Sequence, residues 1–161
     1  IDMKILLAVD FSPLGRRTTG AGYRLAQKIA SEVTFFHCAP QASRFLQGYD
    51  IKAFVSSTGK EEQKNIEDAA KLKLHKVMED VIAENGIKEG LRIEEKVVSG
   101  EPANEILSYA ESNKFDLIFL GYKSFNLIEQ ILVGSTADKV IRYATCSVLI
   151  YRPDRAEHID L

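Results

Sequence analysis

The sequence is poor in several features that would point to particular classes of protein. It has only two cysteines and four prolines in 161 residues, and its 21 lysines and arginines nearly balance its 23 aspartates and glutamates, for a formal net charge of −2. Proteins that bind nucleic acid or anionic membranes usually carry a pronounced basic face. We therefore expect neither nucleic acid nor a membrane among the partners.

Long apolar runs are missing as well. No stretch approaches the roughly 20 apolar residues that cross a bilayer, and the first residues lack the zones of a secretory signal. These absences predict a cytoplasmic protein. Cys38 and Cys146 lie far apart in apolar segments, so we interpret them as small buried residues and not as a disulfide.

What the sequence does have is the composition of one globular domain. With 161 residues, 45% of them hydrophobic, a chain can bury roughly two thirds of the surface that it exposes when unfolded, and it needs no disulfides, metals or cofactors to stabilise its core. We expect a single domain over residues 1–161, with a core from about 3 to 152 and a tail over 153–161.

Short apolar runs alternate with longer segments of helical period along the whole chain. Strands are predicted at residues 5–9, 33–39, 91–98, 116–120 and 147–151, helices at 13–29, 61–84, 102–110 and 137–144, and a long loop at 40–60. Strict alternation predicts an α/β fold, in which helices cover both faces of a five-stranded, doubly wound parallel sheet.

The first predicted helix is rich in glycine, and the first and last helices each have an apolar face. Ser12-Pro13 is a helix start, and Gly15, Gly20 and Gly22 each cost the first helix up to ~1 kcal/mol relative to Ala, which suggests that its backbone lies close to another group. The predicted buried positions are Leu14, Thr18, Leu25, Ala26 and Ile29 in the first helix, and Ala137, Val140, Ile141 and Ala144 in the last.

Ligands of such sheets bind beyond the carboxyl ends of the strands, so Asp10, Ala39, Gly100 and Gly121 are expected at one edge. Gly134-Ser135-Thr136 opens the last helix, where free N–H groups, the helix dipole and two hydroxyls could hold a phosphate. On these residues alone, such a start is more often a simple helix cap.

Several short segments together resemble one family. Gly121, then Ser124, then Gly134-Ser135 after nine more residues is similar to the glycine motif of nucleotide-binding universal stress proteins, in which a second glycine stands where Ser124 is. Residues 4–12, 100–102 and 147–151 match other parts of that family. The resemblance covers about residues 3–152 and implies a Rossmann-like fold of the adenine nucleotide alpha hydrolase type, with strand order 3-2-1-4-5.

The resemblance also implies a ligand, ATP or AMP, with or without Mg²⁺. Adenine would lie near the first two strand ends, the ribose and first phosphate near the fourth, and the phosphates at the last helix. The residues implied are Ala8, Val9, Asp10, Cys38, Ala39, Gly121, Lys123, Ser124, Gly134, Ser135 and Thr136. A loop hydrogen bond is an equal alternative for Asp10, and solvation is the commoner state of a lysine such as Lys123.

Other chemistry finds little support in the sequence. There is no Walker A pattern, and His37, His75 and His158 fit no zinc site or catalytic triad, so we interpret them as structural or solvated. The protein is expected to be a regulatory module with at most slow, incidental ATP hydrolysis. The alternatives are a stress-response dimer or adaptor with a vestigial pocket, of which Ser124 would be the sign, and a flavin or electron-transfer module.

The apolar last strand would lie at the edge of the sheet, where an unpaired strand invites another chain. Family members commonly pair this strand with its copy. The resemblance therefore implies a two-fold homodimer through Val148, Leu149, Ile150 and Tyr151. The alternative is that the tail over 154–161 folds back over this strand.

Overall fold

The computed structural model describes residues 2–42, 57–122 and 133–152 of the chain. All five predicted strands and all four predicted helices are present. They are β1 (Lys4–Ala8), α1 (Pro13–Ile29), β2 (Glu32–Ala39), α3 (Ser57–Asn85), β3 (Arg92–Ser99), α4 (Pro102–Ser112), β4 (Leu117–Gly121), α5 (Ser135–Tyr143) and β5 (Ser147–Tyr151). The predicted loop at 40–60 is too long, because residues 57–60 already belong to α3, and residues 43–56 lie outside the described part.

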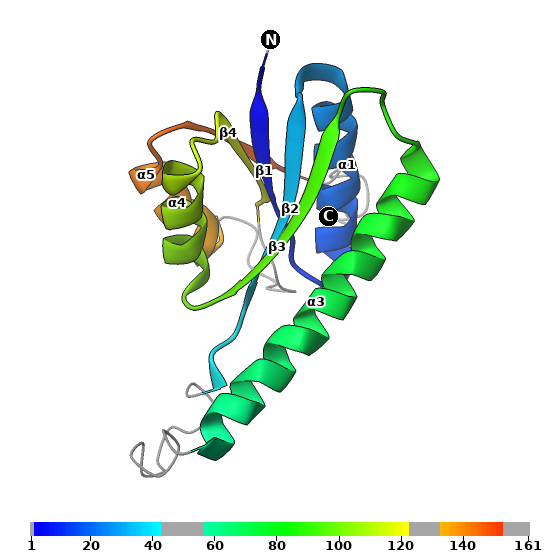
Figure 1. Cartoon of the computed structure of the whole chain (residues 1–161). Helices are drawn as coiled ribbons and strands as arrows, with labels where there is room; N and C mark the ends of the chain where they lie inside the picture. The colour runs from blue at the N-terminus through cyan, green and yellow to red at the C-terminus, as the bar shows by residue number, and fades with distance from the viewer. Residues whose placement is uncertain (1, 43–56, 123–132, 153–161) are drawn as a thin grey trace, which may run out of the picture.

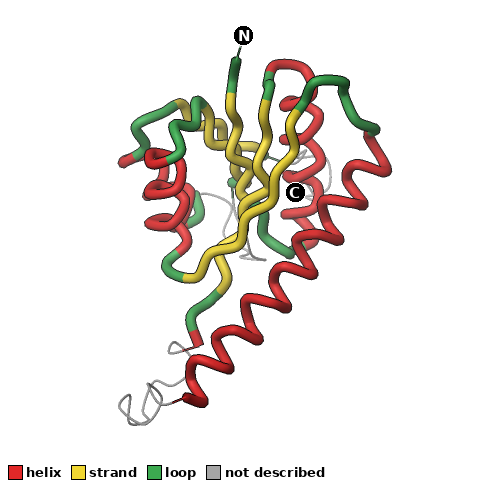
Figure 2. The backbone as a smooth tube through the Cα atoms, in the orientation of Figure 1, coloured by secondary structure: helices red, strands yellow, loops and turns green. Residues whose placement is uncertain are grey.

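The five strands form one parallel sheet in the order β3-β2-β1-β4-β5, which confirms the predicted fold class and strand order. Figure 2 shows the strands in yellow between the red helices. In the centre of the sheet, Leu7 of β1 pairs with Phe35 of β2 on one side and with Phe119 of β4 on the other. β1 lies at the point where the strand order reverses, since the chain winds to β2 and β3 on one side and to β4 and β5 on the other.

The helices cover the sheet in two layers (Figure 1). Tyr23 of α1 and Leu74 of α3 pack with Phe35 in one core cluster. On the opposite face, Ile106 of α4 and Val140 of α5 belong to a second cluster with Phe36. Because side chains alternate along a strand, the neighbours Phe35 and Phe36 serve the two different cores.

The buried faces of two helices differ from the prediction. Ile29 is 40% exposed and Ile141 is 50% exposed, so neither belongs to the core. α1 buries Thr18 and Ala26 as predicted, but the rest of its buried face consists mainly of small residues that were not predicted, namely Gly15, Thr19, Gly20, Gly22 and Tyr23. The reason is a close approach of helix and sheet, as the glycines predicted: a Cβ on Gly22 would meet the Leu7 side chain and lie 2.8 Å from a ring carbon of Phe119.

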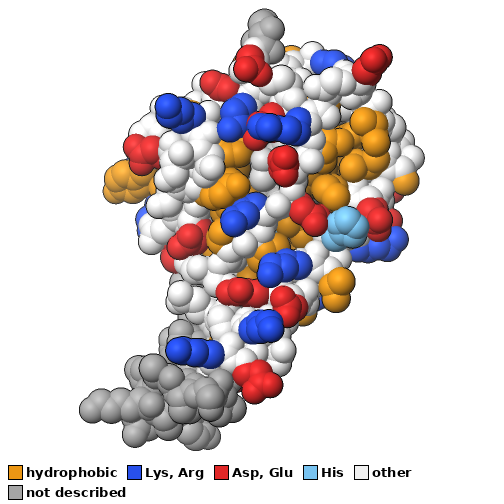
Figure 3. Space-filling view, viewed as in Figure 1, with side chains coloured by type: hydrophobic (Ala, Val, Ile, Leu, Met, Phe, Trp, Pro, Cys, Tyr) orange, Lys and Arg blue, Asp and Glu red, His pale blue; other side chains and the backbone are white. Residues whose placement is uncertain are grey.

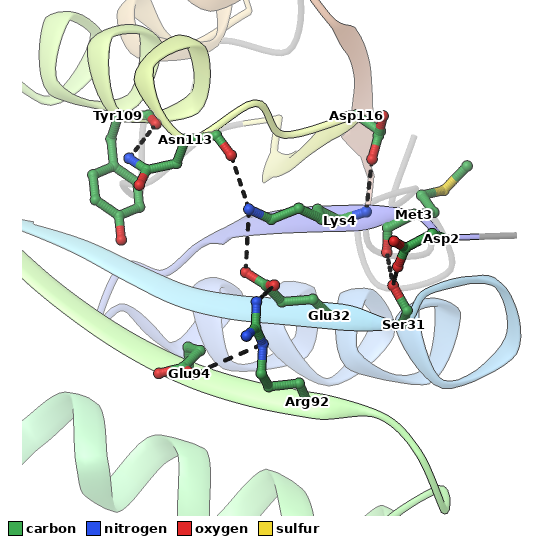
Figure 4. Close-up of polar contacts among 10 residues, drawn as sticks. All are labelled: Asp2, Met3, Lys4, Ser31, Glu32, Arg92, Glu94, Tyr109, Asn113 and Asp116. Carbon is green, nitrogen blue, oxygen red and sulfur yellow. Dashed lines mark hydrogen bonds and ion pairs between the residues drawn. The ribbon is translucent and has the colours of Figure 1, made fainter.

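A polar cluster closes the amino edge of the sheet (Figure 4). The buried Glu32 carboxylate of β2 accepts a hydrogen bond from Arg92 of β3 and pairs with the Lys4 ammonium of β1 at 3.6 Å. Lys4 also donates to the Asn113 carbonyl at 2.8 Å. A buried carboxylate is tolerated when it is paired in this way, so this edge is sealed by the protein's own side chains.

The surface viewed in Figure 3 shows acidic and basic side chains interspersed with apolar ones, and no large area of a single charge is seen on this face. β3 contributes Arg92, Glu94, Glu95 and Lys96 as exposed residues of an edge strand. Charges on an edge strand discourage pairing with a further strand. Among the described residues, no helix is both long enough and apolar enough to cross a membrane.

Candidate functional site

A cavity of about 240 Å³ opens at the carboxyl edge of the sheet. Its wall is built by the ends of β1, β2 and β4 together with the first turns of α4 and α5. The cavity therefore lies where the strand order reverses, which is the usual ligand position in sheets of this topology.

Seven of the residues implied by the family resemblance meet in this cavity. They come from four separate parts of the chain and are Ala8, Val9, Asp10, Cys38, Gly121, Gly134 and Thr136. The other four are placed differently. Ala39 is fully buried, with its carbonyl accepting a hydrogen bond from the Gly100 N–H at 3.3 Å, and Ser135 is exposed and does not line the cavity, whereas Lys123 and Ser124 lie outside the described residues.

The cavity wall also contains residues that were not predicted from the sequence. They are Phe36, His37, Pro102, Ile106, Leu120, Tyr122 and Ala137. Most adjoin a predicted strand end or helix start. Phe36, Ile106 and Leu120 belong to the core cluster between the sheet and α4 and α5, so the cavity has an apolar floor that is continuous with this core.

Asp10 is held by the loop that leads into α1. Its Oδ1 accepts a hydrogen bond from the Ser12 N–H at 2.8 Å, and Ser12 Oγ in turn accepts one from the Gly15 N–H at 3.0 Å. A Cβ on Gly15 would collide with the Asp10 carboxylate. The structure thus shows the loop hydrogen bond that was the alternative for Asp10, and it also places this residue in the cavity wall.

His37 fixes the same loop to β2. Its Nδ1 lies 2.8 Å from the Val9 carbonyl oxygen, and its ring stacks on Phe11 with 4.0 Å between the ring centres. Burial lowers the pKa of His37, although the Val9 carbonyl opposes this shift. Because a carbonyl only accepts hydrogen bonds, Nδ1 carries the proton, and His37 holds Val9 and the adjoining Asp10 in place.

The first turn of α5, the helix that follows β4 in the chain, differs from the first turns of α1 and α4. Ser12 caps α1, and Glu101 caps α4 by accepting hydrogen bonds from the N–H groups of Ala103 and Asn104. Gly134, the N-cap of α5, makes no side-chain cap hydrogen bond, and its own N–H donates to the Tyr122 carbonyl at 2.9 Å.

The first turn of α5 contributes Thr136 and Ala137 to the cavity wall. A helix N-terminus without an internal cap is a favourable place for an anion, because its N–H groups and the helix dipole both attract negative charge. The cavity thus offers an apolar floor and one electropositive end. Within the described ranges, no group of three or more His, Cys, Asp or Glu side chains is placed to hold a metal ion.

The parallel sheet, its strand order and the cavity at the reversal point define a doubly wound α/β protein with a cavity at the carboxyl edge of its sheet. The chain belongs to the universal stress protein family, whose model matches residues 3–152. Universal stress protein YxiE of Bacillus subtilis (strain 168) is 28% identical over 149 residues, which cover 92% of this chain and 98% of the relative.

Solved structures of the family share this fold. Universal stress protein UspA from Lactobacillus plantarum is 22% identical, with a TM-score of 0.74 over 93% of this chain and 97% of its own. A universal stress protein in complex with cAMP is 18% identical, with a TM-score of 0.62 over 93% and 96%. The universal stress protein from Archaeoglobus fulgidus in complex with dAMP is 21% identical, with a TM-score of 0.53 over 94% and 99%.

Proposed function

We propose that this protein is a cytoplasmic regulatory module that binds an adenine nucleotide, ATP or AMP, in the cavity at the carboxyl edge of the sheet. The observation that carries the proposal is the meeting, in one cavity, of an apolar floor with the first turn of α5, whose N-cap Gly134 makes no side-chain cap hydrogen bond. The complexes of two family members with cAMP and dAMP support an adenine nucleotide as the ligand.

In the proposed complex, the apolar purine lies on the floor near Ala8, Val9 and Cys38, and Asp10 contacts the nucleoside. Gly121 bears no side chain, and a Cβ there would lie 3.1 Å from Thr18 Oγ1, so this strand end is already tightly packed beneath the ligand. The phosphate accepts hydrogen bonds from the first amides of α5 and from the hydroxyl of Thr136, which lines the cavity.

The residues favour binding over turnover. Among the described residues that line the cavity, Asp10 is the only carboxylate, and the hydrogen bond from the Ser12 N–H to its Oδ1 fixes it to the loop before α1. A general base must be placed within reach of the attacking water, and we propose a binding role for Asp10 instead. The proposed role is therefore a nucleotide-dependent state of the protein, which a partner would recognise.

The second part of the proposal concerns the partner. β5 is an edge strand, and its apolar residues Val148, Leu149, Ile150 and Tyr151 are only partly buried. β1 and β4, in contrast, are fully buried at their centres. We propose that a second copy of the chain pairs with β5 and covers this apolar edge.

Calorimetric titration with ATP, ADP, AMP and adenosine, with and without Mg²⁺, tests the nucleotide. The variant Gly134→Asp is decisive, because a carboxylate at the N-cap would occupy the amides of α5 as Glu101 does in α4. The backbone of Gly134, at φ −57° and ψ 148°, accepts any residue.

We expect submillimolar nucleotide binding that Gly134→Asp abolishes, while the matched variant Gly134→Ala retains it. Adenosine, which lacks the phosphate, should bind both variants alike. If none of the three nucleotides bound measurably, the proposal would be overturned and the adaptor with a vestigial pocket would be favoured.

A further inference from the structure

Lys139 of α5 and Glu101 of α4 connect the two helices that wall the cavity on one face of the sheet. Lys139 Nζ lies 3.2 Å from Glu101 Oε2, and the two side chains are 40% and 36% exposed. Glu101 directly precedes Pro102, and Lys139 follows Ala137 by two residues, and both of these neighbours line the cavity. The ion pair therefore joins two parts of the cavity wall, and neither of its residues lines the cavity itself.

The first part of α5 is held to its surroundings at two polar points within the described residues. On the β4 side, the Gly134 N–H donates to the Tyr122 carbonyl. On the α4 side, Lys139 pairs with Glu101. Thr136 and Ala137 lie between these two points.

The apolar anchor of α5 is small. This helix has nine residues, of which only Ala137 and Val140 are buried. With so little apolar area in contact, the polar ties contribute a large share of what fixes the orientation of the helix.

We propose that Lys139 is a positioning residue for the phosphate: through its ion pair with Glu101 it holds the first turn of α5 against the cavity. This inference rests on the proposed function, since the ligand is the phosphate of the nucleotide. Amides bind an anion tightly only when they are already oriented towards it, because orienting them on binding costs entropy.

A direct attraction between the Lys139 ammonium and the phosphate makes a different prediction. Both explanations expect Lys139→Met to weaken binding. They differ for Glu101→Gln, which keeps an oxygen to cap α4 but removes the charge that holds Lys139. A freed ammonium would bind the phosphate more tightly, whereas a loosened α5 would bind it more weakly.

We therefore expect AMP to lose affinity by about two- to five-fold in both Lys139→Met and Glu101→Gln, as is typical for a half-exposed ion pair. The double variant should lose no more than either single variant. Lys139→Arg should restore binding, and adenosine affinity should be unchanged throughout. Lys76→Met is the matched control, because Lys76 pairs with Asp80 on α3, across the sheet from the cavity.

Hydrogen exchange of the Asp138 amide, which donates to the Gly134 carbonyl at 2.9 Å and closes the first turn of α5, gives a second readout when it is measured without nucleotide. It should accelerate in both variants and not in Lys76→Met. If AMP binds the wild type but binds Glu101→Gln equally or more tightly, or if exchange is unchanged, the positioning role of Lys139 is wrong and the proposed function stands. If the wild type binds no nucleotide, the proposed function fails and the positioning role with it.

Discussion

The imidazole of His37 donates from Nδ1 to the carbonyl oxygen of Val9 across 2.8 Å. This bond joins the end of β2 to the residue that follows β1, and the stacking of the same ring on Phe11 fixes the next part of the loop. A strand-end histidine thus orients the backbone on both sides of Asp10. This structural role is one of the two predicted for His37, but its partner could not be predicted, because the carbonyl that it contacts lies 28 residues away in the chain.

The buried position of His37 has a consequence for stability in acid. Burial lowers its pKa below the usual value of about 6.5, so the unfolded chain takes up a proton before the folded chain does. The stabilising contribution of this residue is complete above pH 6.5 and is lost as the pH falls from there towards the folded pKa. We expect His37→Asn, which still offers an N–H to Val9, to reduce the decline of the unfolding free energy between pH 7 and 5. Urea unfolding of the wild type and the variant at several pH values measures this decline. If the unfolding free energy of the variant fell as steeply as that of the wild type, the expectation would be wrong.

His75 should behave in the opposite way. Its Nδ1 lies 3.0 Å from Glu95 Oε2 of β3, and Nε2 lies 3.4 Å from Glu79 Oε1. The hydrogen bond to Glu95, followed by the charges of Glu95 and Glu79, raises the pKa of His75. Its contribution is complete below the unfolded pKa of about 6.5 and is lost as the pH rises through the higher folded value.

We therefore expect His75→Gln to be less stable than the wild type at pH 6 and equally stable at pH 9, with a smaller difference at high salt because the pair is exposed. Urea unfolding at the two pH values measures the difference. Glu95→Gln serves as the partner control and should show the same dependence on pH. A difference that grows towards pH 9 would mean that another group is responsible.

Two glycines of α1 make a matched pair for the packing of this helix. In Gly22→Ala the new Cβ would collide with the buried Leu7 and Phe119 side chains, 2.8 Å from the nearest ring carbon, so we expect a loss of about 1–3 kcal/mol. In Gly20→Ala the one contact of the Cβ with the described residues would be the flexible Arg24 guanidinium at 3.3 Å, so we expect a gain of about 0.5–1 kcal/mol. Thermal and urea unfolding of both variants measure these changes. If the two substitutions had effects of the same sign, the helix would not lie as close to the sheet as described.

The apolar edge at β5 predicts an assembly. The charge that Val148→Lys introduces on this edge strand should prevent the pairing of β5 with its copy. We expect sedimentation velocity to show a shift from dimer to monomer. Leu72→Lys is the control, because Leu72 is 75% exposed on α3. A circular dichroism spectrum and melting curve establish that Val148→Lys is folded. A monomeric wild type, or a variant that is still dimeric, would exclude β5 as the interface.

The order of the elements was accessible from the sequence because it depends on local periodicity. The continuous apolar run at residues 5–9 and the 3.6-residue period between Ile66 and Val81 each identify an element without reference to the rest of the chain. Strict alternation of such elements permits few topologies. The predicted strand order followed from the family resemblance, and the sheet confirms it.

The exposure of individual residues was less accessible. Ile29 and Ile141 fit the apolar period of their helices, yet both are largely exposed. Helical period gives the spacing of a face, but the direction in which that face points is set by what the helix packs against. In α1 that direction is set by the close contact of Gly22 with Phe119.

What the sequence by itself determined is the set of strands and helices, their alternation and the small residues at the strand and helix ends, because each depends on neighbours a few positions apart. Only the tertiary structure decided that Asp10, Cys38 and Thr136 share one cavity, that no side chain of the described residues caps α5, and that Lys139 reaches Glu101. The physical reason is that these contacts join residues remote in the chain, and no local pattern encodes a distance that depends on the packing of the whole sheet.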